Sequence, residues 1–488
     1  MTMKITELQP ALVWQAFDEI TKVPRPTHHL DKMKAFLLDW AKRHNIEAEA
    51  DAVGNVVMRV PATPGHEDAP TVVLQGHQDM VAEKLPEVKH DFLEDPITTV
   101  VDGDWVRAEG TTLGADNGLG CASAMACLTD PDLVHGPLEA LFTVDEEQGL
   151  IGANGLQAGF ITGDILLNLD SEEMGQLVIG CAGGKVTECR LPYTLEETPS
   201  NYESLKVSLA GLKGGHSGME IGMGRANANQ QLARVLWEAD AHVTNVEVSE
   251  IDGGNLANAI PRDAHAVVAV SRDAVADFER FISDFNRQLH AEFDMAENHD
   301  FQLKVEKVER RPKVIESSVS HRLIAALYCC PNGVQGMSLA IEGLIETSCN
   351  LASVKMVEND TILITVHQRS SVDSRRDEIA DRISALFGMI GADVTFDDAY
   401  VGWSPNPQSK VLKVAEASYR DLFGKEAKVE ALHAGLETGL FLEKMPHLDM
   451  ISFGPTLKNI HSPSERANIQ SVAEFYRLLK EIITRLAN

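Results

Sequence analysis

Acidic and histidine side chains follow the ends of four apolar runs in this chain, a pattern typical of a metal or catalytic site. Each run reads as a buried strand, and the carboxyl ends of parallel strands meet at one edge of a sheet. The side chains concerned are His77 and Asp79 after 72–76, Glu146 and Glu147 after 141–144, Asp170 after 165–169, and His461 in the loop after 449–453. The sequence therefore predicts that these side chains lie close together.

His77 and Asp79 are two residues apart, so their side chains point to the same side of a strand. Asp79 can therefore accept a hydrogen bond from the His77 imidazole and fix its tautomer, as carboxylates do behind metal-binding histidines. A glycine-rich loop, 110–114, delivers a further carboxylate, Asp116, just before an expected helix. Taken alone, each of these features is explained at least as well by a helix cap, a solvated strand end or a surface loop.

Together, five of these side chains form a ligand set that suits transition metals rather than calcium or magnesium. Imidazole with carboxylate favours zinc, cobalt or manganese, and the lack of a cysteine argues against a structural zinc cage. Two divalent ions and one hydroxide balance three carboxylates, whereas a single ion would leave surplus negative charge. We therefore expect two zinc ions, with cobalt or manganese as substitutes. The expected ligands are His77, Asp116, Glu147, Asp170 and His461.

Such a pair of metal ions predicts hydrolysis. A hydroxide between two zinc ions is a nucleophile at neutral pH, because a bound metal lowers the pKa of water to about 7. Glu146 stands beside the ligand Glu147 and does not need to bind metal. It can take the proton from the water and pass it to the leaving amine, while one zinc ion polarises the scissile carbonyl.

The order of expected elements indicates an α/β catalytic domain. Two amphipathic helices come first, one starting near Pro10 and the next capped by Thr27 and ending near Arg43. Apolar strands then alternate with helices, which favours a mixed, largely parallel sheet sandwiched by helices. The last helix is expected to begin with a capping box formed by Ser471 and Glu474.

The middle of the chain, 187–400, has a different pattern. Its strands, such as 205–210 and 361–367, tend to alternate apolar and polar residues, which is typical of an antiparallel sheet with one solvated face. We expect an inserted α+β lid domain made of two similar halves that meet near residue 301. The catalytic domain would then consist of 1–186 and 401–488.

The composition argues against several classes of partner. The 488 residues carry a net charge of −30, whereas nucleic acids and anionic membranes attract basic patches. No run of about 18 apolar residues could span a bilayer, and the N-terminus lacks the apolar stretch of a signal peptide. Seven cysteines, an odd number without a CxxC pair, indicate a reducing compartment. We therefore expect a soluble cytoplasmic protein whose partner is neither a nucleic acid nor a membrane.

The motifs GHQDM, GADNG, DEEQG, LNLDSEE and HSPSE, in this order, resemble those of the dizinc metallopeptidases related to carboxypeptidase G and aminoacylase. The resemblance covers nearly the whole chain. Four further motifs resemble the branch of bacterial aminoacyl-histidine dipeptidases: CAGG at Cys181–Gly184, GLKGGHSG at Gly211–Gly218, NAIPR at Asn258–Arg262 and HAGLE at His433–Glu437.

The resemblance implies a role for each residue of the expected metal site. Asp116 would bridge both metals and precede a cis peptide to Asn117. The other roles implied are one metal site completed by His77 and Asp170, a second completed by Glu147 and His461, Glu146 as the general base, and Asp79 as the acid that orients His77.

The resemblance also places substrate-binding groups in the lid. It implies that His216 stabilises the oxyanion, that Asn258 and Arg369 hold the substrate's backbone and terminal carboxylate, and that Gly435 lines the pocket. In smaller relatives the lid is about half this size, and a dimer partner supplies the oxyanion histidine. The first lid half is therefore expected to imitate that partner within one chain. A homodimer is also compatible with the sequence.

The function implied is hydrolysis of unblocked dipeptides, with a preference for C-terminal histidine that extends to carnosine-like peptides. The preference rests on resemblance, because no imidazole-binding pocket can be recognised in the sequence. Two alternatives within the superfamily are an N-acyl-amino-acid deacylase and a tripeptidase. A third is a non-catalytic metal-binding protein, against which the intact Glu146 argues.

Overall fold

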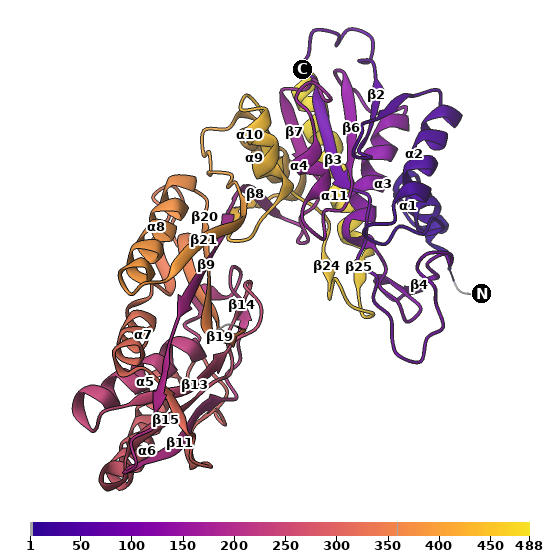
Figure 1. Cartoon of the computed structure of the whole chain (residues 1–488). Coiled ribbons are helices and arrows are strands. Elements are labelled where there is room, and N and C mark those ends of the chain that lie inside the picture. Colours follow the sequence, from indigo (N-terminus) through magenta and orange to yellow (C-terminus); the bar gives the residue numbers. More distant parts are fainter. Residues whose placement is uncertain (1–2, 359) are drawn as a thin grey trace. The chain divides into compact units, whose positions relative to one another are not determined.

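The computed structural model describes residues 3–358 and 360–488, and the chain forms two compact units (Figure 1). The first unit comprises Met1–Gly180, Pro405–Ala431 and Leu436–Asn488. The second comprises Cys181–Ser404 and the short segment Leu432–Gly435. That segment lies within the stretch that we expected to belong entirely to the catalytic domain.

The first unit is built on an eight-stranded mixed sheet with a parallel centre. Strands β6, β3, β7 and β23 run parallel, and antiparallel strands flank them on both sides. This arrangement confirms the expected mixed, largely parallel α/β sheet. In sheet order the strands are β1 (Glu47–Ala50), β2 (Val56–Val60), β6 (Leu138–Thr143), β3 (Val72–His77), β7 (Ile165–Asn168), β23 (Asp449–Ser452), β8 (Gln176–Cys181) and β22 (Lys428–Leu432).

Helices pack on both faces of this sheet. A Cβ atom at Gly76 of β3 would meet Asn117 and Cys121 of α3, so this side of the strand faces α3. The neighbouring Gln75 points to the other face, where its amide donates to Glu437 of α10. The helices are α1 (Ala11–Thr21), α2 (Asp31–Arg43), α3 (Ala115–Thr129), α4 (Ile151–Gly155), α9 (Lys410–Phe423), α10 (Glu437–Lys444) and α11 (Ile469–Ala487), with a 3-10 turn at Ile5–Glu7.

Two of the expected helix caps are wrong. The last helix buries apolar side chains that include Val472, Phe475 and Leu479. However, its N-cap is Asn468, which accepts from the Ser471 N–H, so the expected cap at Ser471 is wrong. Thr27 does not cap the second helix either, because α2 begins only at Asp31. A small sheet completes the unit, in the order β24 (Leu457–Lys458), β25 (Arg466–Asn468), β5 (Trp105–Ala108) and β4 (Thr99–Asp102).

The second unit contains a nine-stranded antiparallel sheet whose two halves have the same strand order. Outward from the central β13–β19 pair, one half reads β13, β15, β11, β16 and the other reads β19, β20, β9, β21. Strand β9 precedes the whole first half in the chain yet lies in the second half. The halves are therefore interleaved in sequence, and no single residue near 301 divides them.

Four helices supply much of the apolar core of this unit, together with the inward face of the sheet. They are α5 (Ala228–His242), α6 (Val275–Phe293), α7 (Ser317–Cys329) and α8 (Asp373–Met389). The strands are β9 (Gly183–Pro192), β11 (Tyr202–Ala210), β13 (Glu247–Gly253), β15 (Ala264–Ser271), β16 (Gln302–Lys307), β18 (Gly333–Met337), β19 (Ile345–Val357), β20 (Thr361–Ser370) and β21 (Asp393–Tyr400). Two-stranded sheets pair β10 (Leu195–Glu197) with β17 (Lys313–Ile315) and β12 (Gly215–His216) with β14 (Ala259–Ile260), and 3-10 turns lie at Ile221–Met223 and Arg272–Ala274.

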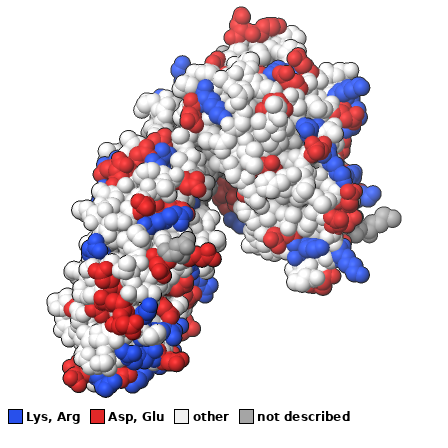
Figure 2. All heavy atoms as spheres, in the orientation of Figure 1, with Lys and Arg blue, Asp and Glu red and all other residues white. Residues whose placement is uncertain are grey.

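Charged side chains of both signs lie on the surface, and none of the seven cysteines forms a disulfide bond among the residues that the structure describes. On the face drawn in Figure 2, lysines and arginines are interspersed with acidic side chains. Within the described part of the chain, no helix has the length and apolar character needed to cross a bilayer.

Candidate active site

Three neighbouring parallel strands bring candidate ligands to one edge of the first sheet. His77 is the last residue of β3, Glu147 follows β6, and Asp170 follows β7. Because parallel strands end at the same edge, this topology alone gathers the three side chains. Asp116 comes from the first turn of α3, and His461 comes from the loop between β24 and β25.

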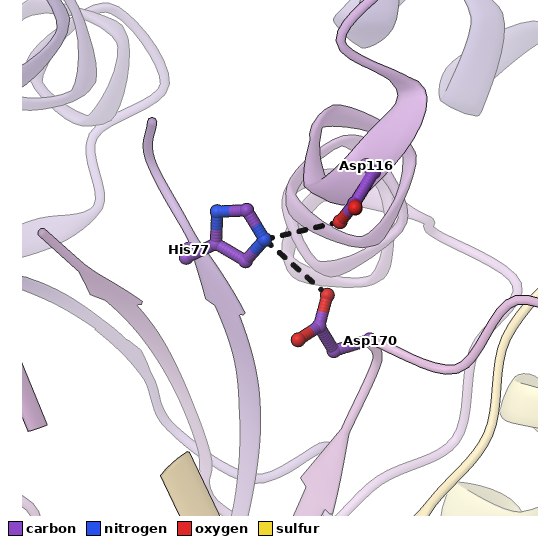
Figure 3. Close-up of side chains that lie close together, drawn as sticks. All are labelled: His77, Asp116 and Asp170. Carbon is purple, nitrogen blue, oxygen red and sulfur yellow. Dashed lines mark hydrogen bonds and ion pairs between the residues drawn. The ribbon is translucent and has the colours of Figure 1, made fainter. Parts of the chain in front are cut away.

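Asp116 lies at the centre of the cluster, between the two histidines. Its two carboxylate oxygens lie 3.1 Å from His77 Nε2 and 3.1 Å from His461 Nε2, respectively. On the first side, Asp170 Oδ1 lies 3.4 Å from His77 Nε2, as Figure 3 shows. On the second side, Glu147 Oε2 lies 3.0 Å from His461 Nε2. The structure thus brings together all five expected ligands.

The side chains of this cluster fit metal ions. Ligand atoms of His77, Asp116 and Asp170 lie within 4.8 Å of one another, and so do those of Asp116, Glu147 and His461. Asp170 Oδ1 and Glu147 Oε1 are buried without a hydrogen-bond partner among the described residues. Buried polar atoms are nearly always satisfied, so two such oxygens beside imidazole nitrogens suit a pair of cations that share Asp116.

The carboxylates lie closer together than their negative charges favour. Burial raises the pKa of Asp170 to about 6, and the charges of Asp116 and Glu147 act in the same direction. Burial also raises the pKa of Glu146 well above its usual value. Hydrogen bonds to Asp116 and Glu147 raise the pKa of His461 to about 11. Each of these shifts favours the protonated form, which carries less negative charge, and divalent cations would reduce the negative charge as well.

Asp79 links the His77 strand end to the loop that carries Glu146 and Glu147. Its Oδ1 lies 3.3 Å from His77 Nδ1 and accepts the Glu146 N–H at 3.0 Å. Its Oδ2 accepts the Glu147 N–H at 3.3 Å and the Thr27 hydroxyl at 2.9 Å. The fully buried Asp79 therefore lies where it can orient His77, and it takes the hydroxyl that we had expected to cap α2.

Arg25, which the sequence analysis missed, connects the same strand end to the Asp116 loop. Its guanidinium is 2% exposed and donates to the carbonyls of Gln78 at 2.9 Å, Asp79 at 2.8 Å and Gly114. A Cβ atom at Gly114 would lie 2.5 Å from Arg25 Nη2, and one at Gly118 would lie 2.6 Å from it. These two glycines of the GADNG motif therefore leave the space that the guanidinium fills.

Glu465, also missed, binds main-chain N–H groups of the Asp116 loop. It is the glutamate of the HSPSE motif and is 2% exposed. Its Oε2 accepts the N–H groups of Leu113 at 2.8 Å and Gly114 at 3.0 Å, and its Oε1 accepts those of Ala115 at 2.8 Å and Asp116 at 3.4 Å. The carboxylate thereby ties the His461 loop to the first turn of α3. The peptide between Asp116 and Asn117 is cis, as the resemblance implied.

A third missed residue, Glu437, is a second carboxylate, and it contacts the strands β3 and β6. It accepts from Gln75 Nε2 at 2.6 Å and from the Thr143 hydroxyl at 2.8 Å, and it is 1% exposed. Burial raises its pKa to about 8. The HAGLE motif contains this residue, but its distance in sequence from β3 and β6 gives no indication of the contact.

The expected substrate-binding residues lie in the second unit. His216 Nδ1 accepts main-chain N–H groups from Gly218 at 3.2 Å and Met219 at 3.0 Å, which places the imidazole proton on Nε2. Burial, followed by the charge of Arg369, lowers the pKa of His216 and keeps the ring neutral. His216 therefore presents an Nε2–H donor. Asn258 is exposed, and its carbonyl accepts the Ser217 N–H at 2.8 Å, so it lies beside the His216 loop.

Arg369 and Gly435 lie on the same side of this unit as His216. A Cβ atom at Gly218 would lie 3.0 Å from His216 Cε1 and 3.3 Å from Arg369 Nε, so both side chains lie beside Gly218. Arg369 is 4% exposed, and its Nη1 donates to the Tyr400 hydroxyl at 2.7 Å. A Cβ atom at Gly435 would lie 2.9 Å from the Tyr400 ring.

Known peptidases match this chain over nearly its whole length. The family model for peptidase family M20/M25/M40 matches residues 73–485. A cytosol non-specific dipeptidase of Escherichia coli (strain K12) is 39% identical over 485 residues, which cover 99% of each chain. The crystal structure of aminoacylhistidine dipeptidase from Vibrio alginolyticus matches with 39% identity and a TM-score of 0.93, over 99% of this chain and 98% of that one.

A more distant structure shares the fold alone. It is a tripeptidase from Staphylococcus aureus, with 16% identity and a TM-score of 0.56 over 98% of this chain and 99% of that one. The full-length matches at 39% identity confirm the resemblance drawn from the motifs. The chain belongs to peptidase family M20/M25/M40.

Proposed function

We propose that this chain is a metal-dependent dipeptidase that hydrolyses unblocked dipeptides and favours those with a C-terminal histidine. The substrate class comes from two relatives, each 39% identical over nearly the whole chain, whose names describe a non-specific dipeptidase and an aminoacylhistidine dipeptidase. The observation in this chain that carries the proposal is that His216 and Arg369 lie close together beside Gly218.

An oxyanion donor and a carboxylate-binding group that lie close together suit a substrate with a single residue after the scissile bond. Successive Cα atoms are about 3.8 Å apart, so a dipeptide presents its scissile carbonyl and its terminal carboxylate close together. The His216 Nε2–H would stabilise the oxyanion, and Arg369 would bind the carboxylate. A tripeptide cleaved after its first residue would carry its carboxylate one residue further away. Asn258 and Gly435 complete the substrate-binding set in this proposal.

The metal roles follow the geometry of the first unit. We assign His77, Asp116 and Asp170 to one ion and Asp116, Glu147 and His461 to the other. Zinc is our first choice, with cobalt or manganese as substitutes, because the ligands are imidazoles and carboxylates. When bound, such ions would lower the pKa of a water molecule and polarise a peptide carbonyl.

Glu146 moves the proton in this scheme. Its buried carboxylate lies with His77 and Glu147 in a group whose ligand atoms are within 4.8 Å of one another. Its raised pKa suits a group that accepts a proton from water and then gives it to the nitrogen of the leaving amine. Asp79 holds both His77 and the main chain of the Glu146 loop, so it fixes the orientation of the acceptor and of one ligand.

The test is a substrate panel on protein stripped by a chelator and then supplied with zinc, cobalt or manganese. The panel contains Ala-His, β-Ala-His, other dipeptides, N-acetyl-Ala-His and Ala-Ala-His. We expect metal-dependent cleavage of the free dipeptides, fastest for C-terminal histidine. Glu146→Gln should abolish turnover but retain metal, and Glu306→Gln, which changes an exposed glutamate of β16, should be neutral. Preferred cleavage of the acetylated peptide would replace this function with deacylation.

The cellular setting is part of the same proposal. Free cysteines are the usual state in the cytoplasm, and the Escherichia coli relative is named a cytosolic enzyme. We therefore place the activity in the cytoplasm and take small peptides as the partner. The mixing experiment described in the Discussion tests whether a homodimer is needed.

A further inference from the structure

One row of side chains crosses four adjacent strands of the second unit and brings Arg369 to Tyr400. Ser348 of β19 pairs with Arg369 of β20, Arg369 pairs with Gly184 of β9, and Gly184 pairs with Tyr400 of β21. Directly opposed residues in antiparallel strands project their side chains from the same face. Because Gly184 has no side chain, the groups from β20 and β21 meet above it, with Arg369 Nη1 and Tyr400 Oη 2.7 Å apart.

Two motif glycines make room for the Tyr400 ring. A Cβ atom at Gly184 would lie 2.5 Å from Tyr400 Cζ, and one at Gly435 would lie 2.9 Å from Tyr400 Cε2. Glycine within a strand removes packing and weakens it, and it is found where another group must approach closely. The CAGG and HAGLE motifs thus each contribute a glycine that the Tyr400 ring packs against. These two close contacts fix the ring beside Arg369.

The pair retains unused donors. Arg369 Nη1–H donates to the Tyr400 oxygen, so the hydroxyl's own proton is available for another acceptor. Arg369 Nε is buried and has no hydrogen-bond partner among the described residues. Around Arg369 lie the imidazoles of His216, His367 and His433, and burial followed by the Arg369 charge lowers the pKa of each. These surroundings favour an incoming anion.

We propose that Tyr400 is a substrate-binding residue whose hydroxyl, together with Arg369, binds the terminal carboxylate of the dipeptide. The guanidinium and the phenol offer donors to two carboxylate oxygens, and the close contacts with Gly184 and Gly435 keep the phenol in place. The position fits the short substrate, because His216, which lies with Arg369 beside Gly218, would hold the carbonyl one residue away. This inference rests on the proposed function and adds a specificity-determining residue to it.

Binding measurements test the inference separately from turnover. The background variant is metal-loaded Glu146→Gln, in which catalysis is removed. Calorimetry compares Ala-His with Ala-His C-terminal amide in this background, with and without Tyr400→Phe, which keeps the ring. Tyr202→Phe, a tyrosine at the far end of strand β11, is the matched control. Thermal unfolding of all variants checks that the fold is retained.

We expect Tyr400→Phe to weaken Ala-His binding about ten- to hundredfold, since a hydrogen bond to a charged group is lost. Binding of the amide should change by less than about threefold, and Tyr202→Phe should change neither. Unchanged Ala-His affinity, or an equal loss for acid and amide, would overturn the role of Tyr400. If the Glu146→Gln background instead binds Ala-His and its amide equally, the site does not recognise the terminal carboxylate, and the proposed role of Tyr400 is wrong.

Failure of the proposed function gives a different pattern. In that case wild-type protein would not hydrolyse dipeptides, while the binding difference between acid and amide could still be measured. A Tyr400 effect confined to the acid would then support an anion site for a different carboxylate ligand. The two conclusions therefore stand or fall on separate readouts.

Discussion

Replacement of Glu465 by glutamine should weaken metal binding although Glu465 is not expected to touch a metal. The carboxylate accepts four main-chain N–H groups from Leu113–Asp116, two on each oxygen. Glutamine places an NH2 group where one oxygen stood, so two of the four donors then face another donor. The affected main chain leads directly into Asp116, which lies between His77 and His461.

The size of the effect follows from the number of lost acceptors. A buried donor left without a partner costs about 1–3 kcal/mol, so two of them cost about 2–6 kcal/mol. Part of this cost appears as lower stability of the metal-free protein. The remainder appears as displacement of the Asp116 loop. Residues that hold metal ligands typically change metal affinity about ten- to hundredfold when replaced, and we expect the same range here.

Competition with a chelator of known affinity measures the zinc dissociation constants of Glu465→Gln and wild type. Urea denaturation with and without saturating zinc separates the loss of folding stability from the loss of metal affinity. Glu474→Gln is the matched control, because it changes a half-buried glutamate on α11 that accepts from the Gln470 side chain and lies outside the Asp116 loop. Zinc affinity within about threefold of wild type, with unchanged stability, would refute the positioning role of Glu465.

Three further predictions address other parts of the molecule. Arg25→Lys should lower metal affinity and kcat/KM at least about tenfold, because one ammonium cannot reach the three carbonyls that the guanidinium joins; activity equal to wild type would contradict this. Mixtures of His216→Ala and Glu146→Ala chains should stay inactive if one chain is complete, whereas restored activity would show that His216 acts across a dimer. Burial lowers the pKa of His433 to about 4, so the unfolded chain binds a proton that the folded chain does not, and stability should fall by up to about 3 kcal/mol as the pH drops from 6.5 to 4. Denaturation across this range should show a smaller loss in His433→Gln but not in the exposed His299→Gln.

The metal cluster could be predicted from sequence because its signal is local. His77, Glu147 and Asp170 each follow an apolar run, and the rule that parallel strands end together supplies the rest. The two expected caps failed for different reasons. Thr27 has a suitable side chain for capping, but Asp79, which is far away in the chain, accepts its hydroxyl. Ser471 lies within the first turn of a helix that Asn468, three residues earlier, already caps.

The domain pattern was predictable in kind but not in detail. Alternating strands in 187–400 indicated an antiparallel sheet, and the repeated order of elements indicated two halves. Nothing in the local pattern of β9 shows that it pairs with β20 and β21, which follow it by more than a hundred and fifty residues. Register across that separation is decided by packing and not by local propensity.

The residues that sequence reasoning missed left a trace of another kind. Arg25 and Tyr400 belong to none of the motifs, and Glu465 is the last residue of HSPSE. The partners of all three residues lie far away in the chain. Glycines mark two of them: Gly114 and Gly118 leave space for Arg25, and Gly184 and Gly435 leave space for Tyr400.

A glycine in a motif can therefore have two meanings. It can permit an unusual backbone conformation, or it can leave space for a side chain from a distant part of the chain. Gly114 serves both purposes, since its φ of 67° also favours glycine. Gly184 has no such positive φ, and close approach of the Tyr400 ring is the physical reason for it. Replacement of Gly184 by alanine separates the two interpretations. Its backbone permits alanine, so a loss of Ala-His binding would come from displacement of the phenol, and unchanged binding would show that the ring needs no vacancy.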